Sequence, residues 1–191
     1  MDNKFFTFIK PYLNFIDTGK IFRNPISWLY YAGAAVSILT PLYVMYLAID
    51  NKIFSTPAKF IIAFILIWFL LCVASWIIFQ IWWDRKDKVL SSTSENDKFV
   101  AIPVFAHFVQ TLGEVYGSLI AILGFGFSLI SLVLLGSDAA VLANQIGLGF
   151  INPGVAGLII SPITGFIMLV VARVISELIR ALAEIANNTA K

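Results

Sequence analysis

Four long runs without a charged residue constrain this chain more than any other feature. They cover residues 28–49, 60–83, 117–135 and 155–172. Each run approaches or exceeds the roughly 20 helical residues that cross about 30 Å of hydrocarbon. The composition agrees, because 60% of the residues are hydrophobic and 13% are charged. The sequence therefore predicts an all-α, polytopic membrane protein with four transmembrane helices at about these positions.

Residues 101–135 carry a second pattern, which we call the span-three seam. Read as one helix, this stretch places small or polar residues three and four positions apart along a single line. The seam consists of His107, Gln110, Glu114, Gly117, Ala121, Gly124, Ser128 and Ser131. The intervening residues are mostly Phe, Val, Leu and Ile, so we expect the helix to turn its apolar side to lipid and its seam to protein. Residues 155–187 are the expected antiparallel partner.

The distribution of positive charge predicts the orientation in the membrane. Of the 13 Lys and Arg residues, all but Lys52 and Lys59 fall before the first span, between spans two and three, or after span four. Because cytoplasmic loops are enriched in Lys and Arg, we expect both termini and the central loop in the cytoplasm. An even number of spans independently requires the two termini to share one side.

The N-terminal segment, residues 1–23, is Phe-rich and amphipathic, which favours an interfacial helix on the cytoplasmic leaflet or one packed on the protein itself. The membrane domain then covers residues 24–191. Asn24-Pro25 and Thr56-Pro57 resemble helix starts, with a capping residue followed by proline at the first helical position. We expect spans one and two to begin there.

The C-terminal residues 173–187 are predicted to continue span four as a cytoplasmic helix. A charged face recurs at helical spacing in Arg173, Glu177, Arg180 and Glu184. A second, apolar line contains Ile175, Leu178, Leu182 and Ile185. This apolar line is long enough to dock on another helix.

One ion pair is predicted from depth alone. Span three enters the bilayer near Glu114, and span four leaves it near Arg173. If the two helices are neighbours, these opposite charges meet at the same level, and we expect them to pair.

The connection 136–154 carries one charge, Asp138, among many apolar residues. Such a connection is poorly suited to open water. The preferred interpretation is a short helix, capped by Ser137 or Asp138, that lies on or dips into the outer leaflet. A re-entrant pore element is the alternative.

Residues that carry chemistry are scarce. The chain has one His and one Cys, Cys72, and no group of Asp, Glu and His at metal-ligand spacing. No glycine-rich phosphate loop follows a strand. We therefore expect no enzyme activity, no catalytic residue, no metal, no cofactor and no nucleic-acid partner.

The C-terminal segment resembles an uncharacterised family of small bacterial two-span membrane proteins. The residues that carry the resemblance are Gly157-Leu158, Pro162, Phe166, Arg173-Val174, Glu177-Leu178, Ile185-Ala186 and Asn188-Thr189. The resemblance covers roughly the last 35 residues, with a looser similarity in the Phe-rich N-terminal stretch. It implies a bacterial inner-membrane protein and brings no activity with it.

Two functions from different classes fit these features. The first is a non-enzymatic membrane protein that packs or oligomerises through span three and docks partners on its cytoplasmic face, with a second copy or another membrane protein as partner. The second is an oligomeric channel whose wet path is lined by the span-three seam, with Glu114 and His107 at its mouth. A proton-coupled transporter is a third, less favoured reading.

Overall fold

The computed structural model describes residues 9–11, 20–91, 101–149 and 153–189, and these are almost entirely helical. The long helices are α3 (Lys20–Asp50), α4 (Ala58–Ser91), α5 (Ala101–Ile130) and α7 (Val155–Thr189). Short elements join them: η1 (Ile53–Ser55), η2 (Ser131–Leu135), η3 (Gly136–Asp138) and α6 (Ala139–Gln145). Four helical segments are long and apolar enough to cross a membrane, so the predicted all-α polytopic fold is confirmed.

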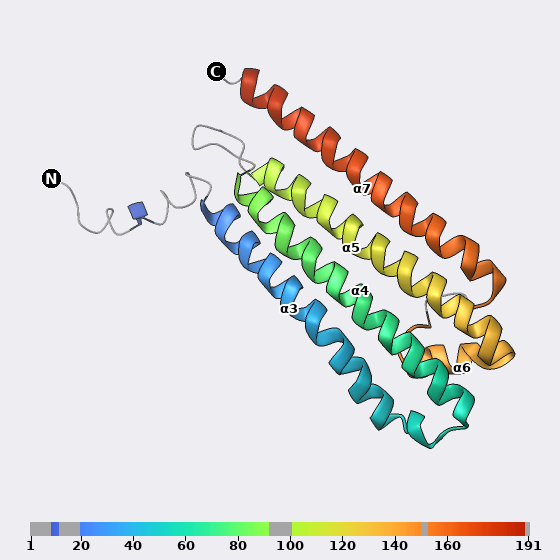
Figure 1. Ribbon diagram of the computed structural model, residues 1–191. Helices are drawn as coiled ribbons and strands as arrows, with labels where there is room; N and C mark the ends of the chain where they lie inside the picture. The colour runs from blue at the N-terminus through green and yellow to red at the C-terminus, as the bar shows by residue number, and fades with distance from the viewer. Residues whose placement is uncertain (1–8, 12–19, 92–100, 150–152, 190–191) are drawn as a thin grey trace.

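The long helices form a row in which each runs antiparallel to the one before it (Figure 1). α3 packs on α4, α4 on α5, and α5 most extensively on α7, whereas α3 touches α5 only slightly. α7 therefore lies at one edge of the row and α3 at the other. α3 begins and α7 ends at the same end of the row. We call this end, which contains Arg85, the Arg85 end, and the opposite one the α6 end.

Proline affects the two predicted helix starts differently. α4 begins at Ala58, directly after Pro57, as expected. The start predicted at Asn24 is wrong, because α3 already begins at Lys20 and contains Pro25. A proline this close to the start of a helix removes one backbone hydrogen bond while its fixed φ still suits the helix. The predicted interfacial segment 1–23 lies mostly outside the described residues.

Two apolar clusters form the core. One, toward the α6 end, gathers Phe64, Phe127 and Leu142, the last contributed by α6. The other, toward the Arg85 end, surrounds Tyr30 and Trp82, whose rings meet edge to face with centroids 5.2 Å apart. Large apolar side chains on the outer faces of the helices are exposed, as hydrocarbon contact requires.

The connection between spans three and four folds as the predicted short helix. α6 has seven residues and buries Ala139, Leu142 and Ala143. Asp138 occupies the N-cap position, but the predicted capping is wrong, because its side chain makes no capping hydrogen bond and its carboxylate pairs instead with Lys59 at the start of α4. α6 thus closes the α6 end of the row by packing on the protein.

α7 is one unbroken helix from Val155 to Thr189, so the predicted helix over 173–187 is continuous with the span.

Candidate functional site

The span-three seam is the contact surface between α5 and α7. At Gly117 and Gly165 the backbones of the two helices come into close contact. A Cβ atom added to Gly117 would lie 2.7 Å from the Gly165 carbonyl oxygen, and one added to Gly165 would lie 2.8 Å from the Cβ of Ala121. Glycine lets the two backbones approach this closely, as small-residue motifs do in membrane helices. The seam therefore packs two helices of the same chain together.

The same contact continues toward both ends of the seam. Gly113 faces Ala172, and Gly124 faces Ser161. Near the α6 end, Ser128 and Ser131 are buried. The Ser131 hydroxyl donates to the Ser128 carbonyl oxygen (2.8 Å) and accepts from the backbone N–H of Gly154 (2.9 Å). Ser131 thereby ties the chain just before α7 to the seam.

Glu114 binds Arg85 of α4 at the Arg85 end. The guanidinium donates from Nε to Oε2 and from Nη2 to Oε1, both at 2.7 Å. The side chains are 17% (Glu114) and 24% (Arg85) exposed. Two-point charged hydrogen bonds of this kind are strong and geometrically specific. The pair locks α4 to α5.

Gln110 extends this pair to α7. Its Nε2 donates to Oε1 of Glu114 at 2.9 Å, and its Oε1 accepts from Nη2 of Arg180 at 2.8 Å. The same Arg180 nitrogen lies 2.9 Å from the hydroxyl oxygen of Ser176. We call Arg85, Glu114, Gln110, Arg180 and Ser176 the polar bridge. It joins α4, α5 and α7 on one level of the row.

The predicted ion pair between Glu114 and Arg173 is wrong in its partner. Arg173 instead pairs with Glu177 one turn along its own helix, on an exposed surface. Glu114 and Arg173 do lie at the same level of the row, since both line one shallow surface hollow. However, Arg85 reaches the same level from α4 and donates from two of its three guanidinium nitrogens in a less exposed site.

The polar core at this end has a second member that sequence reasoning missed. The hydroxyl groups of Tyr30 and Thr111 lie 2.9 Å apart, and both residues are buried. The Thr111 hydroxyl also donates to the carbonyl oxygen of His107. Thr111 is next to Gln110 in the sequence but is not one of the seam residues, so the seam pattern did not identify it. His107 itself is half-buried.

Metal binding finds no support among the residues that the structure describes. In that part of the chain, no three His, Cys, Asp or Glu side chains are grouped closely enough to hold an ion. Cys72 is a half-buried free thiol.

The surface nevertheless offers one continuous apolar line, which we call the α7 stripe. It recurs every three or four residues from the span into the C-terminal part of the helix. Its members are Ile160, Ile163, Ile167, Val171, Val174, Leu178, Leu182 and Ile185, each 48–66% exposed. The repeating steps of three, four and four residues follow the 11-residue period of a nearly straight helical line. The charged residues Arg173, Glu177 and Glu184 are exposed on a flank of α7, about 90–130° around the helix from the centre of the stripe.

Comparisons with models of known protein families, with curated proteins and with solved structures gave no significant match.

Proposed function

We propose that this chain is a non-enzymatic assembly protein of the bacterial cytoplasmic membrane, with both termini in the cytoplasm, that associates with a second copy of itself along the α7 stripe. The observation that carries the proposal is the exposure of Leu178, Leu182 and Ile185. These residues lie beyond the charged level of Arg85, Glu114 and Arg173, where hydrocarbon no longer explains an apolar surface.

The length of α7 supports this placement. The helix continues past Arg173 to Thr189, which is about 24 Å at 1.5 Å per residue. Leu178, Leu182 and Ile185 are each more than 60% exposed within this stretch. Exposed apolar residues in a line outside the bilayer mark an interaction surface.

A second copy suits the stripe better than other partners do. Because the stripe is continuous, its occupant has to be an apolar helix both inside the bilayer and beyond it. A second α7, related by a twofold axis along the membrane normal, has that property and meets the first one at equal depth. α7 is at the free edge of the row, so the two rows can join there without rearrangement.

The seam's role within the chain argues against the channel alternative. Gly117, Gly124, Ser128 and Ser131 are buried, and three glycines of α5 along the seam contact α7. They are therefore not free to line a water-filled path. Oligomerisation through span three meets the same difficulty, so we place the contact between copies on α7.

Disulfide crosslinking in native membranes tests the proposal. In a Cys72→Ser background, Leu182→Cys lies on the stripe, and Glu184→Cys lies at nearly the same depth on an exposed flank of the helix, turned about 160° away from Leu182. We expect oxidation to produce a covalent dimer with Leu182→Cys, because equivalent positions at a parallel helix contact bring Cα atoms within the range of a disulfide. Glu184→Cys should remain monomeric.

A second measurement separates a dimer from random collision. Replacing Leu178 and Leu182 with Asn should weaken self-association in nanodiscs about tenfold or more, because two apolar anchors are lost. Replacing Glu177 and Glu184 with Gln should leave self-association in nanodiscs, measured as the mass of the oligomer, unchanged. Equal crosslinking at both cysteines, or a monomeric wild-type protein in nanodiscs, would refute the proposal; a photo-crosslink from Leu182 to a different membrane protein would assign the stripe to that partner instead.

A further inference from the structure

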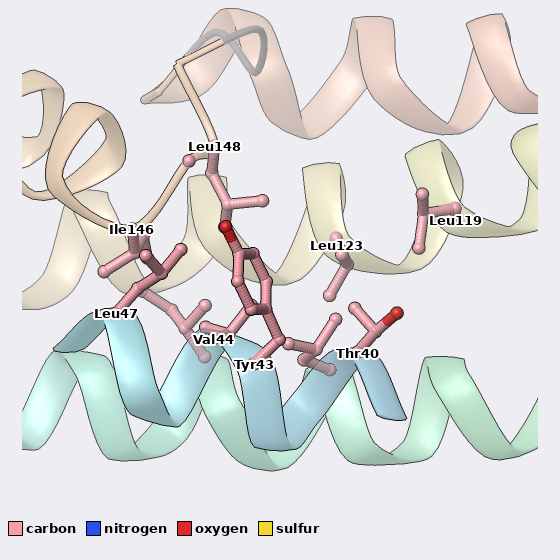
Figure 2. Close-up of a pocket in the computed structure, with 11 residues that line it drawn as sticks. Thr40, Tyr43, Val44, Leu47, Leu119, Leu123, Ile146 and Leu148 are labelled. Atoms are coloured by element: carbon pink, nitrogen blue, oxygen red, sulfur yellow. The ribbon is translucent and has the colours of Figure 1, made fainter. Parts of the chain in front are cut away.

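An apolar cavity of about 230 Å³ lies between α3 and α5, with α4 as its floor. Val44 and Leu47 of α3 form one wall, and Leu123 of α5 lies on the other side (Figure 2). Ile146 and Leu148, which follow α6, close it toward the α6 end. The cavity exists because α3 packs on α4 and touches α5 only slightly.

The cavity lies beside the part of α3 that is apolar enough to cross a membrane. It extends along α3 from Thr40 to Leu47, which is about 10 Å. At the α6 end the cavity stops at Leu47, one helical turn before Asn51. The Asn51 side chain donates to the backbone oxygen of Gln145. Tyr43, at the cavity rim, is 61% exposed, so the cavity opens sideways toward the surrounding membrane.

A hydroxyl group is placed at this opening. The Tyr43 ring extends from α3 toward the segment that carries Leu148 (Figure 2). The Thr40 hydroxyl donates to the Val36 carbonyl oxygen. The Tyr43 hydroxyl, in contrast, has no hydrogen-bond partner within the described part of the chain. A donor without an acceptor is costly next to hydrocarbon. The acceptors that a membrane supplies at the edge of its hydrocarbon are the carbonyl oxygens of acyl groups.

We propose that this cavity binds an acyl chain from the leaflet at the α6 end, with the Tyr43 hydroxyl donating to the acyl carbonyl or carboxyl oxygen. Its volume exceeds the 150 Å³ of an engineered apolar cavity that takes up benzene. An empty space of this size would forgo the dispersion contacts of its walls. Lipid tails are the apolar molecules that surround the opening. The bound acyl chain belongs either to a phospholipid or to a free fatty acid.

Photo-labelling of the purified full-length protein in nanodiscs tests the site. One arm uses phosphatidylethanolamine nanodiscs with a diazirine on the acyl chain; the other adds a diazirine-bearing palmitic acid. Labelled positions are mapped by peptide mass spectrometry. We expect labels on Leu47, Leu119 and Ile146 in at least one arm, and the arm that labels identifies the source of the chain.

Two phenylalanine substitutions on α3 make a matched pair. Val44→Phe fills the cavity, whereas Val36→Phe makes the same change at an exposed position outside it. Val44→Phe should lower labelling of the cavity residues about tenfold, because two or three methylenes of the chain lose their contacts. Val36→Phe should leave that labelling unchanged. Leu47→Phe is a second filling variant if Val44→Phe does not fold.

Tyr43→Phe tests the carbonyl contact separately. We expect a loss of labelling of about three- to tenfold, as for one hydrogen bond. Cavity labelling that is absent in both arms, or that Val44→Phe and Val36→Phe reduce equally, would overturn the site. Unchanged labelling in Tyr43→Phe would overturn the proposed hydrogen bond. The α7 stripe lies on another helix, so either result is independent of dimer formation.

Discussion

Arg85 of α4 and Glu114 of α5 face each other as a two-point ion pair, with both donor–acceptor distances at 2.7 Å. The pair is largely shielded from solvent, with 24% and 17% of the side chains exposed. Removing one partner of such a pair leaves a poorly solvated charge, which costs more than an exposed salt bridge is worth. The pair therefore provides a sharp test of how α4 and α5 are joined.

We expect Arg85→Met or Glu114→Gln to lower the free energy of unfolding by about 2–3 kcal/mol. Unfolding of the detergent-solubilised protein by SDS, followed by circular dichroism, measures this. Arg173→Met is the control and should cost less than about 1 kcal/mol, because Arg173 pairs with Glu177 on an exposed surface.

Exchanging the charges identifies the partner. Arg85→Glu combined with Glu114→Arg should recover most of the stability lost by either single change. Arg173→Glu combined with Glu114→Arg should recover none. Rescue by the second combination would show that the sequence-based pairing of Glu114 with Arg173 holds in solution.

A second prediction concerns the close backbone contact of α5 and α7 at Gly165. A Cβ at Gly165 would lie 2.5 Å from the Gly117 carbonyl oxygen and 2.8 Å from the Ala121 Cβ. Because these are backbone and short rigid groups, Gly165→Ala should destabilise the protein by about 1–3 kcal/mol. The SDS unfolding assay described above measures it.

Gly126→Ala is the matched control for this change. Its added Cβ would meet the end of the flexible Leu70 side chain rather than backbone. We expect a cost below about 1 kcal/mol, because Leu70 can change rotamer. Equal losses for the two variants would mean that the α5–α7 contact is looser than described.

Residue spacing was sufficient to predict the fold and one side of α5. The four uncharged runs correspond to the four long helices, and Gly117, Gly124 and Ser128 are buried as the seam requires. The pattern is informative here because lipid demands an apolar surface, which leaves small and polar residues for helix contacts.

The sequence was less informative about which helices are neighbours. The estimated depth of each residue predicted that Glu114 and Arg173 lie at one level. Depth does not indicate which neighbouring helix supplies the partner, however. Arg85 and Arg173 were equally good candidates by depth. The contact of Tyr30 with Thr111 was missed for the same reason, because it joins positions 81 apart in the sequence and neither residue belongs to a periodic pattern.

A third prediction follows from Gln110, which links Glu114 to Arg180. Gln110→Met keeps the side-chain length but removes both hydrogen bonds. We expect backbone hydrogen exchange in residues 176–189 to accelerate about tenfold, as for a loss of about 1–2 kcal/mol of local stability. Exchange in residues 155–170 should stay unchanged.

The control for this experiment is Glu184→Gln on the exposed side of α7. It changes one charge without touching the polar bridge, so exchange should not respond. Equal acceleration in both variants, or acceleration along the whole of α7, would show that the bridge does not hold the C-terminal part of the helix in particular.

A fourth prediction concerns water along the seam. In a Cys72→Ser background, Ser131→Cys should fail to react with a water-soluble maleimide, because Ser131 is 1% exposed. Ser137→Cys, two turns away on the exposed surface of the α6 end, should react readily. Rapid labelling of Ser131→Cys in folded protein would revive the channel reading of the span-three seam.

The orientation in the membrane gives a fifth prediction, with Ser137 and Ser91 as reporters. Both residues are exposed, and they lie at opposite ends of the row. Because most basic residues of the described part of the chain lie toward the Arg85 end, the positive-inside rule predicts that this end is in the cytoplasm. A membrane-impermeant maleimide should therefore label Ser137→Cys in intact cells and Ser91→Cys only after permeabilisation. The opposite result would put the exposed end of the α7 stripe outside the cell, and any cytoplasmic role for Leu178, Leu182 and Ile185 would have to be abandoned even if the dimer contact itself were real.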